Sequence, residues 1–209
     1  MKIAIIGVGN VGSNLARSAV SAGHVVTLAA AHPEKAQTVA TQTGAGAAAS
    51  PADAARGADL VVLAVPGTLA AGVVADLAPS LTGAVVVDAT NPLDDTYTDL
   101  VIAGNSGAQA VQQAAGAVAV VKAFNTVFAS RYAAPTEAGQ PLQVLIAGDD
   151  TAAKERVATF AESIGFTALD AGGLRQARSL EEIAFLNITL NATRGWAWRS
   201  AFQLVGPTA

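Results

Sequence analysis

A glycine-rich segment near the start of the chain constrains its fold more than any other feature. Residues 2–6 have the pattern of a short buried strand, and Gly7-Val8-Gly9-Asn10-Val11-Gly12 follows directly. Beyond this loop, small and apolar residues recur at helical spacing, at Leu15, Ala16, Ala19 and Val20. A G-x-G-x-x-G loop between a strand and a helix predicts a site for the pyrophosphate of a dinucleotide.

Each glycine of this loop has its own physical task. Gly7 allows the tight turn between strand and helix, Gly9 lets the backbone approach the pyrophosphate, and Gly12 lets the helix pack closely on the strand. The free N–H groups and the positive end of the helix dipole then face the anion. An ordinary structural turn is the alternative interpretation of the same glycines.

Composition narrows the class of protein. Of the 209 residues, 52% are hydrophobic and 13% are charged, which suits a single domain with a sheet buried on both faces. The net charge of -4 and the scattered basic residues argue against a nucleic-acid partner. With no Cys and only two His, we expect no metal site. The sequence shows neither a signal peptide nor a run of transmembrane length, so we expect a cytoplasmic protein without a membrane partner.

Apolar runs alternate with helical patterns along most of the chain. We expect further strands at residues 25–29, 45–49, 58–66, 84–88, 117–124, 143–147 and 166–169, and helices at 33–43, 68–77, 106–115 and 151–164, with a brief helix capped by Ser50. This alternation predicts an α/β fold with a doubly wound, mostly parallel Rossmann-like sheet. The sheet would form a single domain over residues 1–178, and residues 179–209 would be a C-terminal helical extension.

Polar and turn-forming residues follow three of the expected strands. One strand ends in Ala64-Val65-Pro66, the next leads into Asn91-Pro92, and a third leads into Asn125-Thr126. Ordinary turn chemistry explains each of these Pro and Asn residues when it is taken alone. Because ligands bind at the carboxyl ends of strands in open α/β sheets, their coincidence at one edge predicts a ligand site there.

The order of these segments resembles a known family. GVGNVG, AVPG, DATNPL, a Ser-led helix, VVKAFNTV, IAGDD and DAGGL follow one another between residue 2 and about residue 190, as in the NADPH-dependent reductases of the deazaflavin coenzyme F420. These reductases share their nucleotide-binding domain with STEAP-type metalloreductases. The resemblance implies a single Rossmann-like domain with an extension, and direct hydride transfer between NADP(H) and a small-molecule acceptor, F420 or a flavin.

The resemblance also implies roles for individual residues. Residues 8–12 would hold the pyrophosphate, and Val65-Pro66, with Ala64 before them, would border the nicotinamide ribose. Asn91-Pro92 and Asn125-Thr126 would border the nicotinamide and the acceptor slot, and residues 172–174 would lie near the acceptor ring. Hydride transfer between two cofactor rings needs alignment and exclusion of water rather than a general acid, so we expect no catalytic side chain.

The adenosine end departs from the family pattern. Ala30-Ala31 stands where these reductases usually have a Ser-Arg pair for the adenosine 2′-phosphate, and residues 25–32 contain no acid of the kind that binds the ribose of NAD. His32 and Lys35 are the nearby groups that could meet a phosphate, with Glu34 as a competitor. NADP is therefore the expected cofactor, and NAD stays open.

Two further segments carry predictions. Lys122 is expected to be a solvated flank or an ion-pair partner rather than a base. Ser179-Leu180-Glu181-Glu182 predicts a capping box, which opens a helix with an apolar stripe at Leu180, Ile183, Leu186 and Leu190 and with Trp196, Trp198 and Phe202 beyond it. This segment either covers the domain's own core or forms a homodimer interface. We favour the dimer, because the acceptor slot of a one-domain enzyme is otherwise open to water.

Two other functions remain as alternatives. One is a nucleotide-binding redox sensor or regulatory module without turnover, and the other is a flavin or ferric reductase. Pyrroline-carboxylate reductase and the β-hydroxyacid dehydrogenases share the early motifs, but they continue into a long helical domain. Here residues 143–169 predict another β-α-β unit instead.

Overall fold

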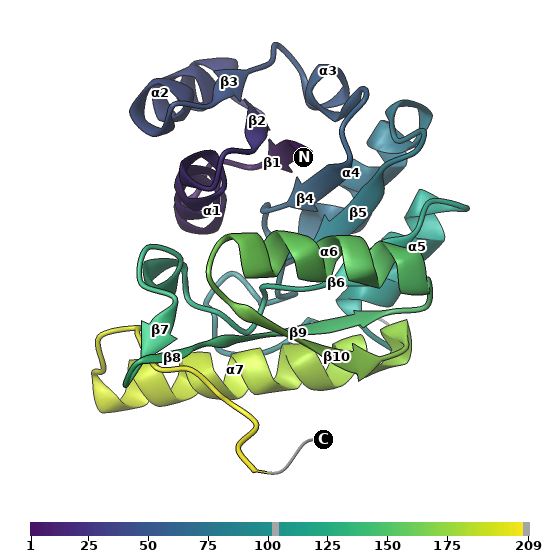
Figure 1. Ribbon diagram of the computed structural model, residues 1–209. Coiled ribbons are helices and arrows are strands. Elements are labelled where there is room, and N and C mark those ends of the chain that lie inside the picture. The colour runs from purple at the N-terminus through teal and green to yellow at the C-terminus, as the bar shows by residue number, and fades with distance from the viewer. Residues whose placement is uncertain (102–104, 207–209) are drawn as a thin grey trace.

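The fold is built on one eight-stranded sheet, seen in a computed structural model that describes residues 1–101 and 105–206. The strand order is β10-β9-β6-β5-β4-β1-β2-β3 (Figure 1). These strands are β1 (Lys2–Ile6), β2 (Val25–Ala29), β3 (Gly46–Ala47), β4 (Leu60–Leu63), β5 (Val85–Asp88), β6 (Val120–Lys122), β9 (Gln143–Gly148) and β10 (Thr167–Gly172). A separate small hairpin, which the sequence did not predict, pairs β7 (Thr136–Glu137) with β8 (Gln140–Pro141).

Helices cover both faces of the sheet. They are α1 (Asn10–Ser21), α2 (Pro33–Thr43), α3 (Pro51–Ala55), α4 (Ala70–Leu77), α5 (Gly107–Ala115), α6 (Thr151–Ser163) and α7 (Ala177–Arg194). Buried side chains of α1, α2 and α6 share one core cluster, and those of α3, α4 and α5 share the other. α7 runs beside β9 and β10 at the far edge (Figure 1). No helix in the part of the chain described is long and apolar enough to cross a membrane.

The first strand shows how the sequence produces two cores. Ile3 and Ile5 face the cluster beneath α1, whereas Ala4 and Ile6 face the cluster beneath α3 and α4. All four are at most 2% exposed, as expected for a central parallel strand. The predicted doubly wound, mostly parallel sheet is therefore confirmed.

One pairing in the sheet is antiparallel. β9 runs against β6, while β10 returns parallel to β9 after α6. The predicted β-α-β unit from residue 143 is thus confirmed, but it joins the sheet in the reverse direction. The chain reaches β9 through the β7–β8 hairpin rather than through a crossover helix, and this connection lets β9 enter from the opposite end.

Several predicted boundaries are too wide. The strands expected at residues 45–49, 58–66 and 117–124 have only their central residues in the sheet. The chain leaves β4 early because the segment from Ala64 to Gly67 turns toward the end of β5, where a Cβ atom on Gly67 would overlap the backbone of Asn91. Apolar composition alone does not reveal where such a turn begins.

Two of the predicted helix starts have serine caps in the structure, and one predicted capping box does not form. Ser50 and Ser106 each accept a backbone N–H from the residue three positions later, as expected for N-caps. The capping box at Ser179 is wrong, because the turn Leu174–Gln176 runs directly into α7 and the helix begins at Ala177. The extension at 179–209 stays a prediction as a unit, and its residues 207–209 lie outside the described range.

The buried face of α7 also differs from the predicted apolar stripe. Leu180 is buried, but Leu186 is 51% exposed. Three polar residues lie on the buried face instead, at Glu181, Asn187 and Asn191. A count of apolar residues cannot reveal this orientation, because polar side chains with partners replace the expected leucines.

Candidate functional site

The turn between β1 and α1 is too tight for side chains at two of its glycines. Gly7 has a φ of 107°, and a Cβ atom there would overlap the carbonyl of Ala64. A Cβ atom on Gly12 would overlap the carbonyl of Gly7 and lie 3.3 Å from the Cβ of Ala64. The first turn of α1 therefore lies directly against the ends of β1 and β4, as the glycine spacing predicted.

Gly9 occupies open space at the start of α1. No heavy atom lies within 4 Å of a Cβ atom built on it, and it caps α1 without any side-chain hydrogen bond. The first helical bond runs from the N–H of Ser13 to the carbonyl of Gly9, so the N–H groups of residues 10–12 are left for an external partner. Together with the helix dipole, this open cradle fits an anion such as a pyrophosphate.

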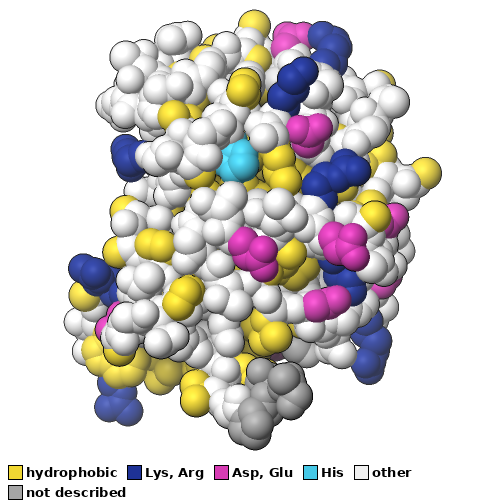
Figure 2. Space-filling view, in the orientation of Figure 1, with side chains coloured by type: hydrophobic (Ala, Val, Ile, Leu, Met, Phe, Trp, Pro, Cys, Tyr) yellow, Lys and Arg dark blue, Asp and Glu magenta, His cyan; other side chains and the backbone are white. Residues whose placement is uncertain are grey.

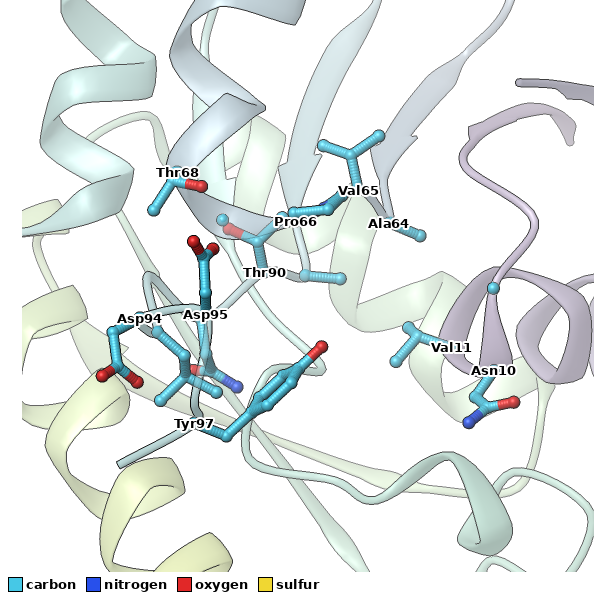
Figure 3. A pocket seen from close by; sticks show the side chains of 15 residues that line it. Asn10, Val11, Ala64, Val65, Pro66, Thr68, Thr90, Asp94, Asp95 and Tyr97 are labelled. Carbon is cyan, nitrogen blue, oxygen red and sulfur yellow. The ribbon is translucent and has the colours of Figure 1, made fainter. Parts of the chain in front are cut away.

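A cavity of about 510 Å³ opens beside this cradle. Its walls come from the start of α1, the segments after β4 and β5, and the loop that follows. In Figure 3, Tyr97 extends into the space between Val11 and Thr90. The lining residues are Gly9, Asn10, Val11, Ala64, Val65, Pro66, Gly67, Thr68, Ala89, Thr90, Asn91, Leu93, Asp94, Asp95 and Tyr97. We call this the first cavity.

A second cavity, of about 390 Å³, continues from the first. The two share the residues Asn10, Val11, Ala89, Asn91, Leu93 and Tyr97. The remaining walls of the second cavity are Phe124, Asn125, Thr126, Val127, Phe128, Ala129, Ala184, Asn187, Ile188 and Trp198. The ends of β4, β5 and β6 thus meet at one site, as predicted, and α7 with the chain beyond it forms the far wall. Pro92 is buried beside Asn91 and is not among the lining residues.

Two asparagines join the strand ends inside the second cavity. Asn91 donates to the carbonyl of Asn125 at 2.9 Å, and Asn125 donates to Oδ1 of Asn91 at 3.0 Å and to the carbonyl of Leu180 at 3.0 Å. Oδ1 of Asn125 is buried and accepts no hydrogen bond from the described residues. An unsatisfied buried acceptor costs about 1–3 kcal/mol, so this oxygen fits a ligand that brings an N–H group.

The predicted adenosine-end residues lie apart from both cavities, at the end of β2 and the start of α2. Ala30 is half-buried, and Ala31, His32 and Lys35 are exposed. Nδ1 of His32 lies 3.6 Å from the carboxylate of Glu34. Glu34 is therefore close enough to pair with His32, and its competition with a phosphate stays a prediction.

Lys122 is fully buried, which corrects one of its two predicted settings. It is not a solvated flank, but the predicted ion pair is confirmed. Nζ of Lys122 lies 2.9 Å from the carboxylate of Asp88 and 3.0 Å from that of Glu181, and it donates to the carbonyl of Thr90 at 2.7 Å. Its ammonium group points into the interior because two carboxylates from other elements converge on it. Lys122 is not among the residues lining either cavity.

Glu181 connects this buried ion pair to the start of α5. Its carboxylate accepts the N–H of Gly107 at 3.1 Å and that of Ala108 at 3.2 Å. A carboxylate at a helix N-terminus is favoured by the helix dipole. Glu181 therefore holds α7, α5 and β6 together, a function that the sequence did not reveal because a capping box offered a simpler explanation.

No sequence pattern predicted that the loop between Leu93 and Leu100 belongs to the site. The carboxylate of Asp94 accepts the N–H of Thr98 at 2.7 Å, that of Asp99 at 3.3 Å and the hydroxyl of Thr96 at 2.6 Å. The Thr96 hydroxyl and these other donors lower the pKa of Asp94 to about 2. The run of Asp and Thr residues signals a turn, but nothing in it shows that Tyr97 reaches both cavities.

Residues 172–174 lie at the end of β10 and the start of the turn that follows it. Leu174 is buried in the turn before α7, and its N–H donates to the carboxylate of Asp149 at 2.8 Å. None of these three described residues lines either cavity. Their proximity to an acceptor ring stays a prediction.

Comparisons with known proteins match nearly the whole chain. The family described as "NADP oxidoreductase coenzyme F420-dependent" matches residues 2–92. The F420-dependent NADP reductase of Methanothermobacter thermautotrophicus is 34% identical over 213 aligned residues, covering 91% of this chain and 89% of that protein. The crystal structure of an Arthrobacter sp. FB24 protein assigned as an F420-dependent NADP reductase is similar with a TM-score of 0.86 and 32% identity, over 99% of this chain and 100% of that one.

A partial match concerns the nucleotide-binding half. Metalloreductase STEAP3 of Rattus norvegicus is 39% identical over 108 residues, which are 51% of this chain and 21% of that protein. The resemblance to both groups that the sequence motifs indicated is therefore confirmed.

Proposed function

Because this chain belongs to the family of F420-dependent NADP reductases, we propose that it transfers hydride between NADP(H) and F420 at the carboxyl edge of its sheet. Membership of this family supports the activity of an NADP(H)-dependent oxidoreductase that acts with F420. What the proposal adds is the location of the reaction and the residues that serve it.

The observation that carries the proposal is the continuity of the two cavities. They share six residues, so rings bound in each would meet at Asn91, Leu93 and Tyr97. Direct hydride transfer requires two rings in contact, with the reacting atoms about 3–3.5 Å apart. A site in two joined compartments supports this geometry without a second domain.

The dinucleotide would occupy the first cavity. Gly9 and the N–H groups of residues 10–12 would bind its pyrophosphate, and Val65 and Pro66 would border the nicotinamide ribose. His32 and Lys35 would meet the adenosine 2′-phosphate outside the cavity. Asn91 would lie where the nicotinamide meets the acceptor.

The protein itself would contribute the alignment of the two rings and the exclusion of water. The bound rings supply the hydride donor and acceptor. No Lys, Arg or His is among the described residues that line either cavity, and Asp94, with its pKa of about 2, is ionised and cannot donate a proton at neutral pH. The apolar side chains of Phe124, Val127 and Phe128 would exclude water from the transfer.

We further propose a homodimer. Several large apolar side chains near the C-terminal end of the described chain are exposed, and the face in Figure 2 shows hydrophobic side chains gathered at the lower left, over the end of α7. The exposed large apolar residues of α7 and the described chain beyond it are Leu186, Trp196, Trp198, Phe202, Leu204 and Val205. Apolar patches of this kind mark interaction surfaces in soluble proteins.

Anaerobic turnover is the decisive experiment. NADPH and NADH are each tested against F420, FMN, FAD and a ferric chelate. Steady NADPH oxidation with F420, and label passing from one face only of 4-deuterated NADPH, is the expected result. Tight NADPH binding without turnover on any acceptor would instead favour a redox sensor, and turnover with the chelate or flavins alone would favour a flavin or ferric reductase.

A further inference from the structure

Backbone strain is concentrated at the second cavity. Four non-glycine residues in the described chain have a φ in the left-handed region: Tyr97 at 59°, Phe124 at 67°, Ala138 at 49° and Trp198 at 56°. The three aromatic ones all line the second cavity. Bulky residues rarely adopt this conformation, and such strain persists at functional sites where surrounding contacts enforce it.

Tyr97 is held in this conformation by its own loop. Its N–H donates to the carbonyl of Asp94 at 3.0 Å, while the carboxylate of Asp94 fixes the two following residues. The side chain is nevertheless 68% exposed. The loop therefore holds a large aromatic ring toward solvent at the junction of the two cavities (Figure 3).

Trp198 is also held by hydrogen bonds of its own backbone. Its N–H donates to Oδ1 of Asn191 at 3.0 Å, and its carbonyl accepts the hydroxyl of Ser130 at 2.6 Å. Asn187 and Asn191 also bind Ser200, which fixes the chain just beyond Trp198. Asn187 and Asn191, on the buried face of α7, thus serve to position this tryptophan.

We infer that Tyr97 and Trp198 are the two aromatic walls of the acceptor slot and hold a planar heteroaromatic ring between the end of β6 and α7. Asn125 lines the same cavity, and its buried Oδ1 has no hydrogen-bond partner among the described residues. An N–H on the edge of the ring would supply that partner. Aromatic side chains gain from stacked or edge contacts with flat rings, which suits a three-ring deazaflavin. This inference rests on the proposed function, because it specifies how the acceptor is bound.

Equilibrium binding tests the walls without turnover. F420 is titrated with native enzyme, Trp198→Ala, Trp198→Phe and Trp196→Ala in the absence of NADPH, and its fluorescence polarisation is recorded. Trp196 is the matched control because it is 48% exposed, compared with 44% for Trp198, and lines neither cavity. Trp198→Ala should weaken binding about tenfold, Trp198→Phe by less, and Trp196→Ala by less than about twofold.

Tyr97 should affect both compartments because it lines both. Tyr97→Ala should weaken F420 binding about tenfold and should also make the fluorescence of bound NADPH easier to quench with acrylamide. Tyr97→Phe should behave as native enzyme in both measurements, and Trp198→Ala should not alter the quenching.

Two results would overturn the inference. One is F420 binding that is unchanged in both Trp198→Ala and Tyr97→Ala, and the other is a loss of affinity in Trp196→Ala equal to that in Trp198→Ala. If native enzyme neither binds nor reduces F420, the proposed acceptor fails, and the same variants are titrated with FMN, whose ring system is of similar size. Wall-dependent FMN binding would then support the slot with another acceptor, and wall-independent or absent FMN binding would overturn it.

Discussion

At the scale of single residues, the glycine loop separates ligand binding from folding. Gly9→Val should leave the fold intact, because a Cβ atom there meets no other atom within 4 Å, and should weaken NADPH binding by about two orders of magnitude. The added side chain fills the space of the pyrophosphate. Circular dichroism and NADPH fluorescence titration measure the two effects.

Gly12 provides the contrast to Gly9. Gly12→Ala should lower the free energy of unfolding by about 1–3 kcal/mol, because its Cβ would overlap the carbonyl of Gly7. A folded Gly9→Val variant with native affinity for NADPH would contradict the assigned cradle.

We expect residues 30–35 to determine the choice between NADPH and NADH. Without an Arg fork and without a ribose-binding acid, native enzyme should prefer NADPH by only about one to two orders of magnitude at low salt. Ala30→Ser with Ala31→Arg should tighten NADPH and leave NADH nearly unchanged. The ratio of kcat/KM values for the two cofactors, measured at low and high salt, checks this, because screening should shrink the native preference.

Glu34 supplies a matched variant for this prediction. Glu34→Gln removes the carboxylate 3.6 Å from His32 and should raise the NADPH preference without adding any contact. A native enzyme that prefers NADH would contradict the assignment of His32 and Lys35.

At the scale of elements, the buried ion pair ties α7 to the sheet. Glu181→Gln should lower the free energy of unfolding by about 3–5 kcal/mol and the Tm by about 10 °C, because it breaks a fully buried charge pair. Glu182→Gln is the matched control, since Glu182 pairs with Arg178 at the surface and should contribute less than about 0.5 kcal/mol. Equal effects in the two variants would show that the buried pair has no special weight.

The stabilisation that Asp94 gives to the loop from Leu93 to Leu100 should be lost at acid pH. The pKa of Asp94 is lowered from 3.8 to about 2, so its stabilising bonds are fully present above about pH 4 and are lost as the pH falls through 3.8 toward 2. Asp94→Asn should therefore be less stable than native protein at pH 6 but equal to it near pH 2. Asp99→Asn, a change on the same loop, should show a much smaller pH-dependent difference, because Asp94 accepts four bonds from the loop's Thr and Asp residues. Denaturant unfolding at several pH values measures the effect.

Local patterns predicted some elements well and others poorly, for identifiable reasons. β1 and α1 were recognised because each is buried through its own periodic residues. α7 was recognised as a helix, but its start and its buried face were not. Partners far away in the sequence decide both, since Glu181 faces Lys122 and Asn191 faces the chain at Trp198. No local pattern records such partners.

At the scale of the whole molecule, the exposed apolar patch should mediate association. Leu186→Arg should convert a dimer to a monomer in sedimentation equilibrium, because Leu186 is 51% exposed at the centre of α7's outer face. Val25→Arg, at a site 65% exposed on β2, should leave the dimer intact. Native protein that stays monomeric at concentrations of tens of micromolar would contradict the proposal.

The alternation of strands and helices predicted the sheet as a whole. It also predicted the edge of the sheet at which polar residues gather. The reversed direction of β9 did not follow, because the hairpin of β7 and β8 that turns the chain is only four paired residues and carries no helical or strand period. The aromatic walls did not follow either. Tyr97 and Trp198 lie about a hundred positions apart, and only the tertiary structure places them at one cavity.

Because Tyr97 and Trp198 lie so far apart in the sequence, the two compartments are completed at different times during synthesis. Ribosomes make the N-terminal cradle at Gly9 and the strand ends up to Asn91 first, and domains fold in that direction during synthesis. Trp198 is added much later, and it reaches its place only when Ser130 and Asn191 can bind it. We therefore expect a nascent chain to capture its dinucleotide before the last wall of the second compartment exists, and bound nucleotide would favour the native sheet while the remainder is being made.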